Sequence, residues 1–138
     1  HAEVNVHCAY QPMRSVRTRR WKYIRRYAAY PHPMLANIDN GPSKLLLMEH
    51  GLAERPFAAE ALYDLIYDPN ESCNRAADPA LADVVADMRR RLEAWMRATG
   101  DPLLDGVISL PETAVVSRPE DVNPGDVWAY TEKREGLA

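Results

Sequence analysis

Cysteine is scarce in this sequence, and long apolar runs are absent. The 138 residues include two cysteines, Cys8 and Cys73, which lie 65 positions apart and match neither a disulfide framework nor the spacing of a zinc site. We expect both to be buried free thiols, and a single bridge between them is the alternative. No apolar run approaches the roughly 20 residues that a membrane-spanning helix needs. The sequence therefore indicates neither a disulfide-rich scaffold nor a membrane-spanning protein.

A strong excess of either charge is also missing. The 17 Lys and Arg residues against 20 Asp and Glu give a net charge of −3, which implies no general affinity for nucleic acid. The hydrophobic content of 46% and the length are ordinary for one globular domain. The chain begins at His1, without an initiator Met or a charged-then-apolar signal segment, so we expect a fragment of something longer.

The first eight residues alternate between polar and apolar side chains. This period of two predicts a strand over residues 3–8 whose apolar side is buried; that side consists of Ala2, Val4, Val6 and Cys8. Its other side carries the carboxylate of Glu3, the amide of Asn5 and the imidazole of His7. These three groups could hold a sugar or an amine by directional hydrogen bonds. The alternative is a polar face that meets only water, and the sequence leaves both open.

A strongly basic hairpin comes next. After a connection over residues 8–12, residues 13–18 and 21–27 predict two strands around the turn Arg19-Arg20, since Trp, Tyr and Ile favour strands. Seven of the 17 cations fall within 13 residues that contain no acid: Arg14, Arg17, Arg19, Arg20, Lys22, Arg25 and Arg26. Aromatic residues interleave with them, as on a platform for nucleic acid or an anionic glycan. The alternative is a sheet face whose arginines pair with carboxylates elsewhere.

The middle of the chain is irregular. Within residues 30–56, Ser43 predicts the N-cap of a short helix that runs through His50 and stops at Gly51. One broad side of that helix would be apolar, formed by Leu45, Leu46, Leu47 and Met48. Residues 62–67 then predict a strand. The turn at residues 68–71 ends it, because Pro69 cannot donate to a ladder.

A long helix follows over residues 79–99. Asp78 is a suitable N-cap, Pro79 suits the first helical position, and Gly100 suits the stop. Apolar side chains form one stripe at Leu81, Val84, Val85, Met88, Leu92, Trp95 and Met96. The predicted fold class is therefore α+β, a small antiparallel sheet of about four strands covered by one long helix.

The remaining parts are a Pro-rich insertion and a tail. We expect a body over residues 1–102 and an extended tail over residues 103–138. Pro111, Pro119 and Pro124 break regular elements in the tail, and Trp128 and Tyr130 indicate that part of it docks on the body.

Two motifs resemble sulfatases of the alkaline-phosphatase superfamily. The first is similar to their C-terminal run "E-L-Y-D-L…D-P-x-E-x-x-N-L-A…D-P", with Arg75 in place of Leu. It comprises Glu60-Ala61-Leu62-Tyr63-Asp64-Leu65, Asp68-Pro69-Asn70-Glu71, Asn74, Ala76-Ala77 and Asp78-Pro79. The second resembles their "M-R-A-V-R-T-x-R-Y-K-Y-I" hairpin, with Trp21 in place of Tyr. It is Pro12-Met-Arg-Ser-Val-Arg-Thr-Arg-Arg-Trp-Lys-Tyr-Ile24. The resemblance covers about 100 of the 138 residues. With Glu3-Val4 upstream, Tyr10 and Pro12-Met-Arg-Ser-Val16, the chain looks most like the heparan N-sulfatase (sulfamidase) branch.

The resemblance implies chemistry that this chain lacks. Such sulfatases hydrolyse sulfate esters or sulfamates with a formylglycine made from the Cys of a Cys-x-Pro-x-Arg motif, assisted by a calcium ion. Neither Cys8 nor Cys73 lies in that motif, and no Asp-Asp pair follows a strand as a calcium ligand. We therefore expect a C-terminal subdomain without nucleophile, cofactor or metal site of its own. The calcium and the formylglycine would belong to an N-terminal catalytic domain.

Two functions remain at this point. In the first, the chain is part of a sulfatase, and Glu3, Asn5, His7 and Arg14 line the pocket of a sulfated small molecule or sugar, with neither membrane nor nucleic acid as partner. In the second, it is a stand-alone module that binds an anionic polymer through the basic hairpin. Upstream coding sequence with a Cys-x-Pro-x-Arg motif would separate the two.

Overall fold

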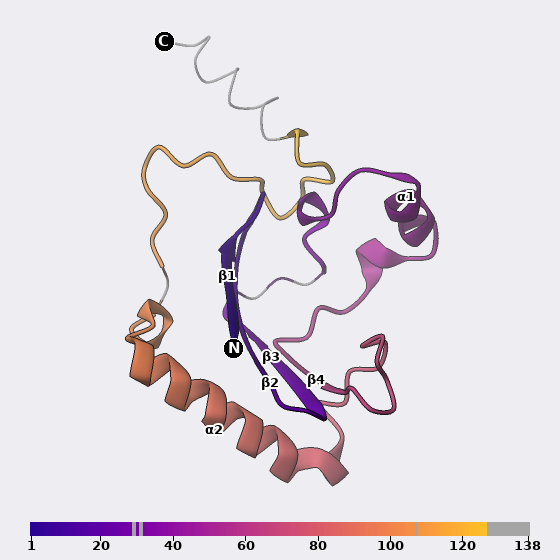
Figure 1. Ribbon diagram of the computed structural model, residues 1–138. Helices are drawn as coiled ribbons and strands as arrows, with labels where there is room; N and C mark the ends of the chain where they lie inside the picture. Colours follow the sequence, from indigo (N-terminus) through magenta and orange to yellow (C-terminus); the bar gives the residue numbers. More distant parts are fainter. Residues whose placement is uncertain (29, 31, 107, 127–138) are drawn as a thin grey trace. The chain divides into compact units, whose positions relative to one another are not determined.

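Four strands form one sheet in the order β1-β2-β3-β4 (Figure 1). The computed structural model describes residues 1–28, 30, 32–106 and 108–126. The strands are β1 Ala2–Val6, β2 Tyr10–Arg17, β3 Trp21–Arg26 and β4 Glu60–Asp64. β2 pairs with β3, and β3 with β4, both antiparallel. The predicted α+β class with a four-stranded antiparallel sheet is confirmed.

Contacts divide the chain into two compact units. Unit 1 comprises His1–Val4, Pro12–Ala28 and Ala58–Ile108, and unit 2 comprises Asn5–Gln11, Ala29–Phe57 and Ser109–Ala138. The predicted docking of Trp128 and Tyr130 lies outside the described residues.

The basic hairpin forms where the sequence predicts it, but β2 starts earlier. The expected connection over residues 8–12 is wrong for its last three residues, since β2 begins at Tyr10. Pro12 fits this strand because its carbonyl accepts from the Tyr27 amide at 2.9 Å and no donor is needed there. Thr18 closes the turn: its hydroxyl oxygen accepts from the Trp21 amide at 2.9 Å, and its own amide donates to the Trp21 carbonyl at 2.8 Å.

β4 ends at Asp64, three residues before the predicted end at residue 67. The Asp64 side chain accepts from the Ile66 amide at 3.2 Å, and its carbonyl accepts from the Asp68 amide at 2.7 Å. These bonds fold residues 65–68 into a turn. As a result, Ile66 and Tyr67 are 59% and 81% exposed instead of lying in a strand.

The polar residues of the first motif fasten the segment between β4 and the long helix. The Asp68 carboxylate accepts from the Ser72 and Cys73 amides at 3.0 and 2.8 Å. Asn74 accepts from the Leu62 and Ala76 amides and donates to the Glu60 carbonyl, each at 3.0 Å. Asp78 then caps the helix entry by accepting from the Ala80 amide at 2.9 Å. Within the described structure, these three motif residues hold backbone amides.

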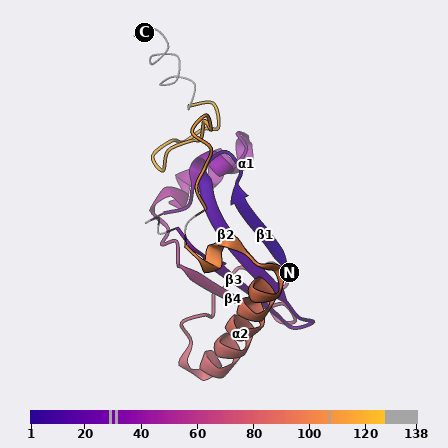
Figure 2. The same ribbon diagram turned by 90° about the vertical axis from the view of Figure 1, so that its left-hand side faces the viewer.

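The long helix covers one face of the sheet in unit 1 (Figures 1 and 2). A 3-10 turn at Pro79–Leu81 leads into α2, Ala82–Thr99, which ends at Gly100 with φ 62°. The prediction of a helix over residues 79–99 is thus confirmed. Together, β2–β4, α2 and the segment after it bury one apolar core: Val16, Tyr23, Leu62, Val85, Met88, Leu92, Met96 and Leu103.

In unit 2, the short helix α1 spans Pro42–Glu49. Its N-cap is Gly41 instead of the predicted Ser43, because Pro42 takes the first helical position; Gly51 (φ 78°) follows its end. The buried residue of α1 is Lys44, whose ammonium donates to the carbonyls of Ile38 at 2.9 Å and Val122 at 2.5 Å and to Asn40 Oδ1 at 3.1 Å. The predicted apolar side is turned to solvent, with Leu45, Leu46 and Leu47 exposed by 64%, 56% and 41%.

Candidate functional site

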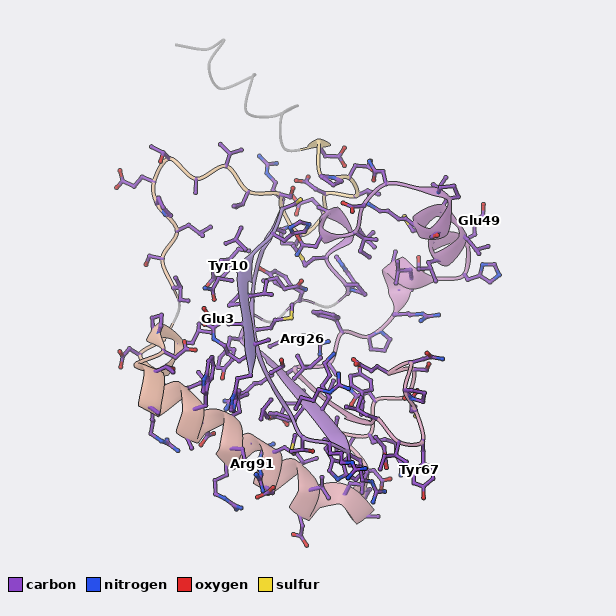
Figure 3. All side chains as sticks on the ribbon, viewed as in Figure 1. Glu3, Tyr10, Arg26, Glu49, Tyr67 and Arg91 are labelled. Atoms are coloured by element: carbon purple, nitrogen blue, oxygen red, sulfur yellow. The ribbon has the colours of Figure 1, made fainter. Side chains whose placement is uncertain are left out.

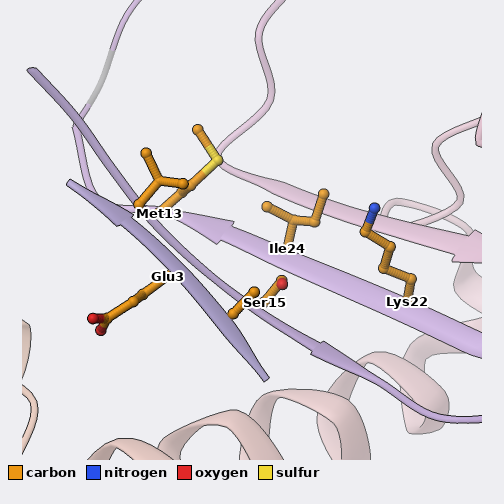
Figure 4. A pocket seen from close by; sticks show the side chains of 7 residues that line it. Glu3, Met13, Ser15, Lys22 and Ile24 are labelled. Atoms are coloured by element: carbon orange, nitrogen blue, oxygen red, sulfur yellow. The ribbon is translucent and has the colours of Figure 1, made fainter. Parts of the chain in front are cut away.

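Two of the predicted substrate-binding residues, Glu3 and Arg14, lie in unit 1, and of these two only Glu3 is exposed. Its carboxylate lies 3.6 Å from Arg14 Nε, and its side chain is 58% exposed. Figure 4 shows Glu3 directed away from Met13, Ile24 and Lys22, and Figure 3 shows it on β1. The Glu3 carboxylate, which is only loosely paired with Arg14 of β2, is therefore an accessible negative charge on β1.

Arg14 itself is buried and tied to the end of the long helix. Its Nε and Nη2 donate to the two carboxylate oxygens of Asp101 at 2.5 and 3.0 Å, and Nη1 donates to the carbonyls of Val4 and Met13 at 3.2 and 3.0 Å. The Arg14 guanidinium holds the pKa of the Asp101 carboxyl below its usual range, against the opposing effect of burial. Direct substrate binding by Arg14 stays a prediction. The contacts observed indicate a positioning role, since they fix β1 next to β2.

Asp101 is a residue of this site that the sequence patterns do not single out. Its pairing with Arg14 joins residues 87 positions apart. In the sequence, Asp101 is recognisable only as an acid directly after the helix-ending Gly100, and this position does not indicate that Arg14 is its partner.

Asn5 and His7 belong to unit 2. Asn5 is half-buried in β1, whereas His7 is exposed and lies beyond the end of β1 at Val6, so the prediction of a strand continuing to Cys8 is wrong. The cause is Asn37, whose side-chain oxygen accepts from the amides of Cys8 and Ala9 at 3.0 and 2.8 Å and draws them into a bend. His7 is therefore presented by a bend instead of by a strand face.

The apolar side of β1 is not buried as predicted. Val4 is 41% exposed, and Val6, in unit 2, is 39% exposed. In unit 1 this side of the sheet contains a hollow of about 160 Å³ (Figure 4), lined by Ala2, Glu3, Val4, Met13, Ser15, Lys22 and Ile24. α2 packs on the opposite face of the sheet, so it does not cover this hollow.

The cations of the hairpin are mostly paired with acids. Arg14 binds Asp101, and three further ion pairs join Arg20 to Asp64 at 2.8 Å, Lys22 to Glu71 at 2.6 Å and Arg25 to Glu93 at 3.3 Å. Arg20 also lies over the Trp21 and Tyr67 rings, 4.7 and 5.6 Å from their centroids. In the described chain, Arg17 and Arg19 form no ion pair. The structure thus favours the paired sheet face over a freely charged platform.

The two cysteines are free thiols, but they are not both buried. Cys8 is half-buried and Cys73 is exposed, because Cys73 lies in the surface turn that Asp68 holds. Among the residues whose placement is described, no group of three or more His, Cys, Asp or Glu could hold a metal ion. None of the helices in that part of the chain has both the length and the apolar character to cross a membrane.

Comparison with known proteins gives a clear relationship. An ulvan-active sulfatase from Formosa agariphila is 32% identical over 101 residues, which cover 72% of this chain and 20% of that protein. The chain is homologous to part of a sulfatase. It spans about a fifth of the length of this curated relative, so the sulfatase-related segment is short compared with the whole. No protein-family model matches the chain.

A solved structure supports the fold of this sulfatase-related chain. The crystal structure of a protein assigned as a sulfatase from Bacteroides thetaiotaomicron superposes with a TM-score of 0.50 at 21% identity. The match covers 90% of this chain and 23% of the other. At this identity, the likeness concerns the fold alone.

Proposed function

We propose that this chain is the C-terminal part of a sulfatase that hydrolyses sulfate esters or sulfamates. The observation that carries the proposal is the 32% identity over 101 residues to a sulfatase, in a chain that keeps the two motifs of the C-terminal region. The hairpin motif further favours the sulfamidase branch within that class.

The chemical step would lie in a separate N-terminal catalytic domain. That domain would supply the formylglycine and the calcium ion, since neither Cys8 nor Cys73 lies in a Cys-x-Pro-x-Arg motif. We expect the purified 138-residue chain to hydrolyse no aryl sulfate and no N-sulfoglucosamine. Calcium-dependent turnover that scales with the concentration of this chain would contradict the assignment.

Two exposed apolar surfaces would contact the catalytic domain. In unit 1 the open sheet face presents Val4 beside the hollow formed with Met13 and Ile24. In unit 2, α1 presents three leucines, Leu45, Leu46 and Leu47. Exposed apolar surface of this kind marks interaction sites. The catalytic domain is the proposed occupant, because the matching segment makes up only 20% of the curated relative.

The polar groups at the start of the chain would form part of the substrate pocket. Glu3 would accept hydrogen bonds from sugar hydroxyls or pair with an amine, and His7 would donate to a hydroxyl or to the sulfate. Asn5 would add an amide that both donates and accepts. Arg14 would act indirectly: it is anchored by Asp101 and, from there, positions the Glu3 carboxylate and the β1 backbone.

Kinetics of the full-length enzyme would test this assignment. His7→Ala and Glu3→Gln should each lower kcat/KM for the natural sulfated sugar by about tenfold or more, equivalent to about 1.4 kcal/mol. A small aryl sulfate, which lacks the sugar groups, should be affected much less. Equal losses on both substrates together with a lowered melting temperature would show that these residues are structural.

The stand-alone binding module is the weaker proposal. It requires a hairpin with available positive charge, and four of its seven cations are engaged by Asp101, Asp64, Glu71 and Glu93.

A further inference from the structure

A groove of about 490 Å³ lies between the end of β2 and the outer side of α2 in unit 1. Arg17 and Thr18 border it from the hairpin, and Arg91 and Trp95 border it from α2, where Figure 3 shows Arg91. Its volume falls within the range of sites for small molecules, about 300–1,000 Å³. The proposed pocket wall, formed by Glu3, Asn5, His7 and Arg14, shares no residue with this groove.

The charge of the groove is positive. None of the described residues that line it is an Asp or a Glu. Arg17 is exposed and has no ion pair within the described structure. Arg91 donates to Asp87 at 2.6 Å, but Arg90 binds the same carboxylate, so two guanidinium groups share one negative charge. An anion entering the groove would therefore meet two cations and no opposing carboxylate among these residues.

One wall of the groove is aromatic. The His1 ring stacks on the Trp95 indole with a centroid distance of 4.9 Å and an interplanar angle of 4°. Both residues line the groove, together with the aliphatic side chain of Val16. Flat aromatic surface beside cations suits a ring that has an apolar face and an anionic substituent. A sulfated or carboxylated sugar has both, because its ring C–H groups form an apolar face and its anionic group can take two parallel hydrogen bonds from a guanidinium.

We infer that this groove is a binding site for an anionic sugar unit of a sulfated polysaccharide. Arg17 and Arg91 bind the anionic substituent, and the stacked His1–Trp95 pair forms the wall that packs against the sugar ring. Nucleic acid suits the groove less well, since a strand carries a phosphate on every nucleotide and the neighbouring hairpin cations Arg20, Lys22 and Arg25 are already paired. The inference does not depend on the chain being part of a sulfatase.

Affinity electrophoresis of the 138-residue chain in gels containing dextran sulfate tests the site, with uncharged dextran as the reference. Arg17→Ala and Arg91→Ala should each raise the dissociation constant for dextran sulfate about fivefold or more at ~0.15 M salt. Two matched variants remove the same charge outside the groove. Arg19→Ala acts at the hairpin turn, and Arg90→Ala removes the other partner of Asp87 from the same helix. Each of these should change the constant less than about twofold.

Three outcomes would overturn the inference. Equal weakening in all four variants would mean that dextran sulfate responds only to overall charge. No weakening in Arg17→Ala and Arg91→Ala would place binding elsewhere. Tighter binding of oligothymidylate than of dextran sulfate would indicate a nucleic-acid surface. Circular dichroism of each variant checks that it is folded, which we expect because all four arginines are exposed. Sulfatase turnover plays no part in this test, so its result is separate from that of the proposed function.

Discussion

The guanidinium of Arg14 and the carboxylate of Asp101 meet inside unit 1, with 0% and 1% of their side chains exposed. One lies in the second strand and the other directly follows the residue that ends α2. Removing such a charge from water costs several kcal/mol, which only good geometry and further hydrogen bonds repay. Here Asp101 also accepts from the Leu103 amide at 3.0 Å, and Arg14 reaches two backbone carbonyls. The pair therefore joins the end of α2 to the sheet.

Loss of one partner of this pair should be strongly destabilising. We expect Asp101→Ala to lower the free energy of unfolding by about 3–5 kcal/mol, because it leaves the Arg14 charge buried and uncompensated. Urea denaturation of the purified chain measures this. Asp87→Ala is the matched control, since Asp87 pairs with Arg90 and Arg91 at the surface; it should cost about 1 kcal/mol or less. Similar costs for both would show that the buried pair contributes little.

The same carboxylate should contribute to acid sensitivity. The pKa of Asp101 is held below its unfolded value of about 3.9, mainly by the Arg14 guanidinium. For a lowered pKa, the stabilisation is complete above about pH 4 and is lost as the pH falls through the folded-state value. We expect Asp101→Asn to show a shallower loss of stability between about pH 5 and pH 2 than the unchanged chain.

Melting temperatures recorded across that pH range give the two slopes. Glu49→Gln provides the control, because Glu49 is exposed on α1 and forms no ion pair in the described structure. Parallel curves for Asp101→Asn and the unchanged chain would contradict the prediction.

Asn74 should matter more for stability than its position in a surface segment suggests. Asn74→Ala removes three hydrogen bonds to the backbone of Glu60, Leu62 and Ala76 and should cost about 1–3 kcal/mol. Thermal melting is sufficient to detect this. Asn70→Ala is the comparison, since Asn70 is an exposed turn residue without a side-chain hydrogen bond among the described residues; a change beyond about 0.5 kcal/mol there would argue against a specific role for Asn74.

The exposed sheet face around Val4 leads to a prediction that compares the 138-residue chain with the full-length protein. In the purified chain Val4 is 41% exposed, so Val4→Ser should change stability by about 0.5 kcal/mol or less. In the full-length protein the same change should cost about 1–2 kcal/mol more, because the proposed contact with the catalytic domain buries this side chain. Chemical denaturation of both proteins makes the comparison. Equal effects in the two would mean that this face stays exposed.

Local patterns were sufficient for the helices and for most strands. The apolar stripe from Leu81 to Met96, the Asp78 cap and the Gly100 stop depend only on neighbouring residues, and α2 forms where they predict. The β2–β3 hairpin likewise follows from the local preference of Trp, Tyr and Ile for strands. The tertiary α+β arrangement then follows, because a small sheet needs a helix to cover one of its faces.

Tertiary structure decided which polar groups are buried and which apolar groups are exposed. Lys44 is buried because its ammonium donates to three oxygens outside α1, those of Ile38, Asn40 and Val122. The leucines beside it in α1 remain exposed. Arg14, a candidate substrate ligand by sequence, is enclosed because Asp101 reaches it from the far end of α2. His7 lies outside β1 because the amides of Cys8 and Ala9 donate to the Asn37 side chain and not to a neighbouring strand. Periodicity records the hydrophobicity of each side chain along one element. It cannot record which partner another element brings to it, and for a charged or amide side chain that partner determines whether burial is stable.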